Sequence, residues 1–291
     1  METTELIKKV RKIEIKTRGL TNQIFSGEYH SAFKGKGMTF SEVREYQYGD
    51  DIRLIDWNVT ARFNHPYIKV YEEERELTVM LLVDVSASEH FGTSKKLKRE
   101  QLTEIAAVLS YSAIKNNDKV GMILFSDRIE KFIPPKKGKT HILHIIRELI
   151  QFEPVSKKTD ISVALKYFSN VIKKRAIVFL LSDFLNDRFE DPLRIVSRKH
   201  DLVALRVYDQ REKELPRIGL LQIRDAESGE IKTIDTSNNK TRKNYTNWWL
   251  VKESRLDEMF IRNGIDAVRI RVDEDYVKPL IRMFKKRERR K

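Results

Sequence analysis

The chain has 291 residues, of which 40% are apolar and 34% charged, so it can bury one large core or two modest ones. It contains no cysteine, which excludes disulfides, thiolate zinc sites, iron–sulfur clusters and cysteine nucleophiles. Its formal net charge is +14, and it contains no long apolar run that would predict a transmembrane helix.

The first 76 residues predict an N-terminal helix followed by a small β-rich appendage. Residues 1–18 form a charged amphipathic pattern without the apolar stretch of a signal peptide, so we predict a cytoplasmic protein. The next stretch is rich in ion pairs and aromatic residues, and we expect it to dock on the main sheet. Five charged residues beside Trp57 are either a binding face or an internal network that fastens the appendage to the core: Arg44, Asp50, Asp51, Arg53 and Asp56.

Strands and helices alternate from Leu77 onward, which predicts an α/β domain over residues 77–291 with a mostly parallel sheet flanked by helices. Short apolar runs predict five strands, over residues 77–83, 120–125, 176–182, 202–208 and 265–270. Apolar residues at helical spacing predict helices over residues 96–117, 140–151, 160–173, 191–198, 248–263 and about 275–287. A hairpin is expected before the fifth of these helices, with strands over residues 220–224 and 230–233.

The most informative motif lies where the first predicted strand ends. Asp84, Ser86 and Ser88 follow the apolar run 77–83 at spacings of two residues. A strand that is apolar on both faces belongs inside a parallel sheet, and such sheets bind ligands beyond their carboxyl ends. One carboxylate and two hydroxyls are hard oxygen donors, which suit Mg²⁺ first and Mn²⁺ or Ca²⁺ as alternatives. The motif therefore predicts part of a divalent-cation site.

Two further residues are candidates for the missing ligands. Asp183 follows the apolar strand 176–182, so we expect its carboxylate to lie level with that of Asp84. Thr159 directly precedes a predicted helix on the same rim. Each residue also has a purely structural interpretation: Thr159 caps the helix, the serines satisfy loop amides, and Asp183 caps the segment after its strand. Taken together they predict a metal site made of Asp84, Ser86, Ser88, Thr159 and Asp183.

This set resembles the metal-ion-dependent adhesion site of von Willebrand factor A domains. Longer blocks resemble a bacterial family, the domain of unknown function 58, over residues 49–57, 71–76, 118–121, 181–184 and 200–201. The resemblance implies a von Willebrand factor A-like, Rossmann-like sheet with the ion at its carboxyl edge, and cooperation with a MoxR-type AAA+ ATPase. Glu89 departs from the pattern, which favours an uncharged residue after Ser88. It either occupies a ligand position or weakens the approach of an acidic partner.

The charge of such a site indicates how it would bind a protein. If the three hydroxyls touch the ion and the two carboxylates hold its waters, a Glu or Asp from a partner completes the shell. We therefore predict a non-enzymatic adaptor that docks an acidic group of a MoxR-type AAA+ ATPase or of that ATPase's client. The histidines show no metalloprotease spacing, and no complete phosphate-binding loop is present, so catalysis is disfavoured.

The basic excess supports a second hypothesis. Residues 285–291 carry six positive charges and one negative charge, which suits nucleic acid or an anionic membrane surface, but also a solvated chain end. The tail has no interleaved aromatic residues and the chain shows no RNA-binding signature, so we keep a nucleic-acid or membrane-surface binder as the alternative. An enzyme with an unrecognised site is a third, smaller alternative.

Overall fold

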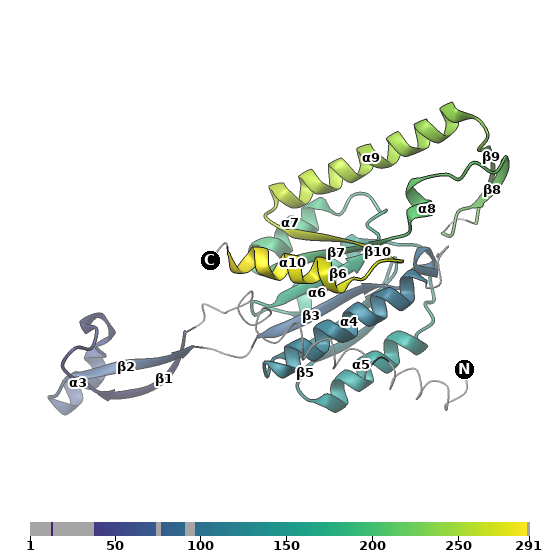
Figure 1. The fold of residues 1–291 in the computed structure, drawn as a ribbon. Helices are drawn as coiled ribbons and strands as arrows, with labels where there is room; N and C mark the ends of the chain where they lie inside the picture. Colours follow the sequence, from purple (N-terminus) through teal and green to yellow (C-terminus); the bar gives the residue numbers. More distant parts are fainter. Residues whose placement is uncertain (1–12, 14–37, 74–76, 91–96, 228, 290–291) are drawn as a thin grey trace.

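A six-stranded sheet with helices on both faces forms the body of the molecule (Figure 1). The structure is a computed structural model, and it describes residues 13, 38–73, 77–90, 97–227 and 229–289. The predicted helix over residues 1–18 lies outside the described residues except for Ile13.

The sheet has the strand order β10-β7-β6-β3-β4-β5, in which β5 runs antiparallel at one edge and the other strands are parallel. Its strands are β3 (Thr78–Asp84), β4 (Lys119–Phe125), β5 (Ile129–Lys136), β6 (Ile177–Ser182), β7 (Asp201–Tyr208) and β10 (Asp266–Arg271). Val83 pairs with Leu181, so the carboxyl ends of β3 and β6 lie side by side. The predicted α/β fold with a mostly parallel sheet is therefore confirmed.

Alternate residues of β3 enter two separate cores, because successive side chains of a strand point to opposite faces. Leu81 belongs to the core that packs under α4 (Lys98–Lys115), α5 (Lys139–Gln151) and α10 (Val277–Glu288). Leu82 belongs to the core on the other face, under α6 (Ile161–Val171), α7 (Glu190–Lys199) and α9 (Asn239–Arg262). This double coverage explains why the strand is apolar along its whole length.

The five predicted strands and the six predicted helices of this domain are present with shifted ends. The α9 helix begins at Asn239, nine residues before the predicted start at residue 248. The prediction missed its first turns because they are polar and show no apolar residues at helical spacing. The sequence analysis missed β5, whose Pro134 and Pro135 argue against a strand. Proline is tolerated there because β5 is an edge strand.

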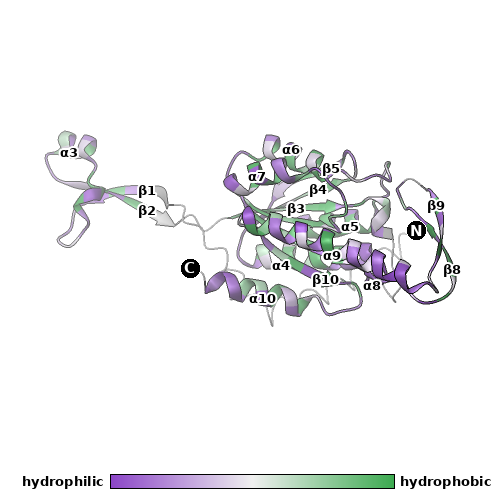
Figure 2. Ribbon diagram, turned by 90° about the horizontal axis from the view of Figure 1, so that it is seen from above, coloured by the Kyte–Doolittle hydropathy of each residue, from purple (hydrophilic) through white to green (hydrophobic). Residues whose placement is uncertain are grey.

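The N-terminal appendage is an antiparallel hairpin of β1 (Met38–Glu45) and β2 (Tyr67–Glu73), with the short helices η2 (Ile52–Leu54) and α3 (Trp57–Phe63) between the strands. Arg44 and Asp50 form a two-bond ion pair (2.8 and 2.9 Å), and Asp56 caps α3. For the residues that the structure describes, the hydrogen bonds and ion pairs of this segment stay within it. Figure 2 shows the hairpin standing apart from the body. The charged cluster thus holds the appendage itself together, and the expected docking on the main sheet is not seen between the described parts.

A second hairpin, β8 (Leu220–Arg224) with β9 (Ile231–Asp235), lies at the end of the body opposite to the first hairpin (Figures 1 and 2). It precedes α9, as the sequence predicts, and it follows a short helix that the sequence analysis did not predict, α8 (Gln210–Lys213). Over the part of the chain described, no helix combines the length and the apolar character that a membrane span needs.

Candidate metal centre

Asp84 is the last residue of β3, and its carboxylate is fixed at the edge of the sheet. The residue is 1% exposed. Its Oδ1 accepts the backbone N–H of Ser86 (3.0 Å), and its Oδ2 accepts the hydroxyl of Ser182 (2.7 Å). Because Ser182 ends the neighbouring strand β6, two strands together set the direction of this carboxylate.

Ser86, Ser88 and Asp183 complete a connected group around Asp84. The hydroxyl oxygens of the two serines lie 3.1 Å apart, and the Ser88 hydroxyl is near enough to Asp183 to help lower the pKa of that carboxyl group. Phe184, directly after Asp183, has a left-handed backbone (φ 56°), which is rare for a bulky residue and is found where a structure needs a sharp turn. The structure therefore brings four of the five predicted site residues to one place.

Thr159, the fifth predicted residue, lies on the loop before α6. The backbone N–H of Ala87 donates to the carbonyl of Lys157 (3.1 Å), which holds this loop against the turn after β3. The capping residue of α6 is Asp160, so the structural interpretation of Thr159 as a helix cap is wrong.

The Thr159 hydroxyl has a partner that the sequence analysis did not consider. It donates to Oε1 of Glu227 in the turn of the β8–β9 hairpin (2.6 Å). The Thr159 carbonyl accepts the side-chain amide of Asn186 (2.8 Å), which follows the loop of Asp183. The role of Thr159 as a metal ligand stays a prediction.

Glu89 adds a third carboxylate to the group. One carboxylate oxygen from each of Asp84, Glu89 and Asp183 lies within 4.8 Å of the others. Glu89 is 1% exposed, and neither of its carboxylate oxygens has a hydrogen-bond partner among the described residues. Burial raises the pKa of Glu89 well above its ordinary value, although the nearby Lys98 opposes this. Burial and the neighbouring Asp183 likewise raise the pKa of Asp84 to about 7.

A buried lysine supplies positive charge on one side of this cluster. Lys98, at the first turn of α4, pairs with Asp183 (2.9 Å) and with Glu212 of α8 (2.6 Å), and its side chain is fully buried. Burial alone would lower the pKa of Lys98, but the carboxylates of Asp183, Glu89 and Glu212 raise it, so it carries a full charge. That charge in turn holds the pKa of Asp183 below its usual value in spite of burial.

The chemistry of the donor set fits a divalent cation. The carboxyl groups of Asp84, Glu89 and Asp183 lie together, and of these the Lys98 ammonium group pairs with that of Asp183, while the buried Arg206 donates to the backbone carbonyl of Asp183. An uncompensated carboxylate in a buried site is costly, so the surplus calls for a proton or a second cation. A hard ion such as Mg²⁺ would be held by oxygens from among Asp84, Glu89, Asp183 and the two serines, some of them through bound water, and would displace the protons that otherwise neutralise the cluster.

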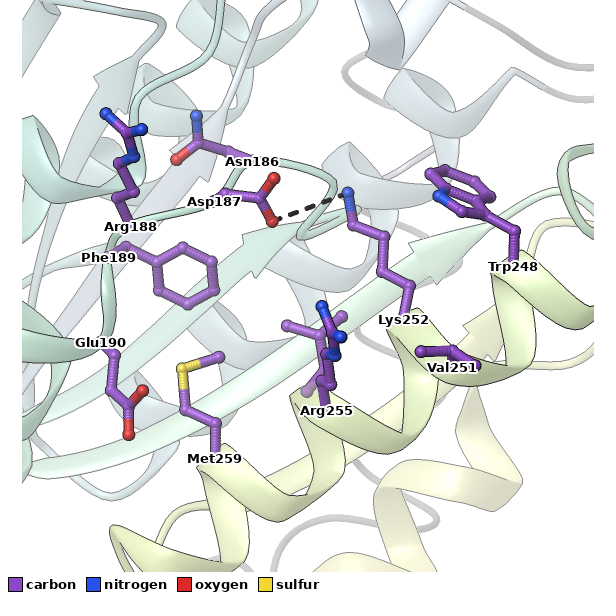
Figure 3. Close-up of a pocket in the computed structure, with 11 residues that line it drawn as sticks. Asn186, Asp187, Arg188, Phe189, Glu190, Trp248, Val251, Lys252, Arg255 and Met259 are labelled. Carbon is purple, nitrogen blue, oxygen red and sulfur yellow. Dashed lines mark ion pairs between the residues drawn. The ribbon is translucent and has the colours of Figure 1, made fainter.

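A cavity of about 430 Å³ lies between α9 and the loop after β6 (Figure 3). Phe189, Trp248 and Met259 form the apolar part of its lining, and Lys252 donates to the carbonyl of Leu185 (2.5 Å). Lys252 also lies 3.9 Å from Asp187, the ion pair drawn in Figure 3. The loop that starts at Asp183 therefore forms one wall of this cavity.

Three residues at this edge escaped the sequence analysis: Lys98, Glu212 and Glu227. Lys98 and Glu212 lie 114 positions apart, and no local pattern indicates that they meet. The only signal was the pattern Asp209-x-x-Glu212, which forms a capping box at α8 but does not reveal the lysine. Glu227 lies in a turn whose sequence predicts a hairpin, but not the direction in which its tip points.

A family model of known proteins matches most of the chain. The family model described as "Protein of unknown function DUF58" matches residues 42–255. Among curated proteins, the uncharacterized protein Rv1480 of Mycobacterium tuberculosis is 27% identical over 294 residues, covering 99% of this chain and 92% of the relative.

Solved structures with some similarity include two proteins of other sources. The conserved hypothetical protein BatB from Bacteroides thetaiotaomicron is 17% identical with a TM-score of 0.49, over 73% of this chain and 99% of that one. Proximal thread matrix protein 1 from the mussel byssus, described with a zinc-occupied MIDAS motif, is 18% identical with a TM-score of 0.37, over 45% of this chain and 38% of that one.

Proposed function

The chain belongs to the DUF58 family of proteins of unknown function, and from that premise we propose that it is a non-enzymatic, metal-dependent protein-interaction adaptor. One observation carries the proposal. Three buried carboxylates from two strand ends converge within 4.8 Å, and one of them, Glu89, has no hydrogen-bond partner among the described residues. Such a cluster is stable at neutral pH only with protons or a cation in it.

In this proposal each residue has a distinct task. Asp84 and Asp183 hold the negative charge at the sheet edge, and Ser86 and Ser88 offer neutral oxygens beside them. Lys98 holds the Asp183 carboxylate in place through an ion pair (2.9 Å). A bound divalent ion supplies a positive charge that attracts an acidic group of a partner, and no bond needs to break.

The partner that the family resemblance supports is a MoxR-type AAA+ ATPase or a client of that ATPase. An acidic residue on the surface of either protein is the chemical feature that the site would recognise. A cytoplasmic location remains a prediction from the N-terminal sequence.

Calorimetric titration with Mg²⁺ tests the proposed ion. We expect wild-type protein to bind Mg²⁺ and the Asp84→Asn variant to bind it at least about 100-fold more weakly, because the variant loses a charged ligand without changing shape. Asp127→Asn is the matched control: Asp127 lies just beyond the carboxyl end of β4, next to β3, but outside the cluster. Equal Mg²⁺ binding by wild type and Asp84→Asn would contradict the proposal.

An affinity pull-down from the source cell, with and without a chelator, tests the partner. We expect an AAA+ ATPase or its client to be retained with Mg²⁺ and released by chelator, and the Asp84→Asn variant to retain none in either condition. Retention that chelator leaves unchanged would refute an ion-mediated contact.

A further inference from the structure

The turn of the β8–β9 hairpin is built to present one glutamate. Between the strands, Asp225 accepts the backbone N–H of Glu227 through its carboxylate (2.8 Å), and its own backbone closes the turn with Glu230 (2.8 Å) and Gly229 (2.9 Å). Gly229 has the left-handed backbone that such a turn requires (φ 75°). The side chain of Glu227 is left at the tip, half-buried.

This glutamate reaches Thr159, a predicted ligand of the metal centre, from a distant part of the chain. Its Oε1 accepts the hydroxyl of Thr159 at 2.6 Å, across 68 residues of sequence. Thr159 is 8% exposed and is freed from helix capping because Asp160 performs that task. The contact thus joins the hairpin tip to the predicted ligand of the carboxyl edge.

The distance between Thr159 Oγ1 and Glu227 Oε1 can be compared with the spacing of ligands around a metal ion. Neighbouring ligands on a small octahedral ion with bonds of roughly 2.1 Å are about 3.0 Å apart. The 2.6 Å between Thr159 Oγ1 and Glu227 Oε1 is the length of a charge-assisted hydrogen bond, and a shift of about 0.4 Å would bring the two oxygens to the separation of neighbouring ligands. An ion that takes the Thr159 hydroxyl is therefore within reach of the Glu227 carboxylate.

We propose that Glu227 is an internal ligand of the metal centre, a carboxylate of the chain itself that takes the position a partner's acidic group needs. This inference rests on the proposed function. A partner then binds only when the hairpin moves aside. The apparent affinity of the partner is therefore reduced by the fraction of molecules in which Glu227 still occupies the ion.

The hairpin has the build of a movable element. Leu220, at the base of the hairpin, and Ile231, next to its turn, are 77% and 61% exposed, so the strands bury little apolar surface. Its base is fixed instead: the fully buried Thr236 hydrogen bonds to Gly219 (2.6 Å) and Ile218 (3.1 Å). A rigid base and a lightly packed arm allow the tip to leave Thr159 without disturbing the main sheet.

Mn²⁺ provides the test, because the water relaxation of bound Mn²⁺ reports how many of its positions hold exchangeable water. We compare wild type with Glu227→Gln, and with Glu230→Gln as a control in the same turn. We expect Glu227→Gln to bind Mn²⁺ about tenfold more weakly and to show faster water relaxation, since water replaces the lost carboxylate. The control should match wild type in both measurements.

A second measurement uses a short peptide with one glutamate as the probe for the partner. On the Mn²⁺-loaded protein it should bind about tenfold more tightly to Glu227→Gln than to wild type, because it no longer competes with Glu227. With Mg²⁺, the peptide should also speed amide exchange in residues 220–235 of wild type. Mn²⁺ and peptide binding that are indifferent to Glu227 would overturn this inference alone, whereas a wild-type protein that takes up no metal would refute the proposed function together with it.

Discussion

The two edges of the main sheet hold the same arrangement of charges but balance it differently. At the amino edge, Arg287 of α10 bridges Asp201 (2.5 Å), which begins β7, and Asp266 (2.6 Å), which begins β10. At the carboxyl edge, Lys98 bridges Asp183 and Glu212 in the same way, at 2.9 and 2.6 Å. One basic side chain between two acidic ones is thus found at both ends of the strands.

The difference lies in what else is buried nearby. The carboxyl edge also holds Asp84 and Glu89, both 1% exposed, and it brings no further lysine or arginine into contact with them among the described residues. A pairing that only stabilises the fold needs no such surplus, because burying an unpaired carboxylate is costly. The surplus negative charge therefore distinguishes a site for a cation from an ordinary ion-pair network.

The largest effect on stability is expected at the amino edge of the sheet, where Arg287 neutralises two carboxylates. Arg287→Met removes the guanidinium group that pairs with both Asp201 and Asp266, and should lower the free energy of unfolding by about 3 kcal/mol. Mg²⁺ binding should not change, because the carboxyl edge is untouched. Urea denaturation and calorimetry measure the two quantities.

Lys286→Met is the control for this variant. Lys286 is exposed and adjacent in sequence, so it should shift stability by no more than about 0.5 kcal/mol. If Arg287→Met weakened Mg²⁺ binding as much as stability, the separation of the two edges would be wrong.

The amino edge also holds a histidine that the fold keeps neutral. His200, 2% exposed just before β7, packs its ring against Phe168, and neither ring nitrogen has a hydrogen-bond partner among the described residues. Burial, helped by the positive charges of Lys199 and Arg175, lowers the pKa of His200 to about 4 from 6.5.

Stability should therefore depend on pH through His200. Its pKa is lower in the folded chain than in the unfolded chain, so the unfolded state binds the proton first. The free energy of unfolding has its full value above about pH 6.5, and it falls by about 2 kcal/mol as the pH approaches 4. Denaturation curves over this range should be flatter for His200→Phe than for wild type. The more exposed His144→Gln serves as control and should keep the wild-type slope.

At the carboxyl edge of the sheet, where carboxyl groups are in excess, removing the carboxyl group of Glu89 should stabilise the protein. Glu89→Met replaces a buried carboxyl group, which has no hydrogen-bond partner among the described residues, by an apolar side chain of similar length. It should raise the metal-free unfolding free energy by about 1 kcal/mol. The same change should weaken Mg²⁺ binding about tenfold, since a carboxylate is lost from the cluster. A variant that is both less stable and equal in Mg²⁺ binding would show that Glu89 serves the fold.

The alternation of apolar strands and periodic helices was enough to predict the sheet, its two helical layers and the placement of Asp84 and Asp183 at one edge. That placement follows from a local rule, because a buried parallel strand ends at its carboxyl edge and the next residue faces the crevice. Lys98, Glu212 and Glu227 follow no such rule: each reaches the edge from a helix or turn whose direction is fixed by tertiary packing. The site residues at strand ends could therefore be predicted from the sequence. The residues that pair with them from other elements, Lys98, Glu212 and Glu227, could not.

The basic residues at the end of α10 provide the smallest expected effect. Lys285→Gln combined with Lys286→Gln removes two exposed charges near the amino edge but leaves Arg287 in its ion pairs. Stability should change by no more than about 0.5 kcal/mol, and chelator-sensitive partner binding should be the same as in wild type. If the double variant instead lost salt-sensitive retention on DNA or anionic vesicles, and the metal made no difference, the basic surface would be the working face and the nucleic-acid or membrane alternative would be favoured.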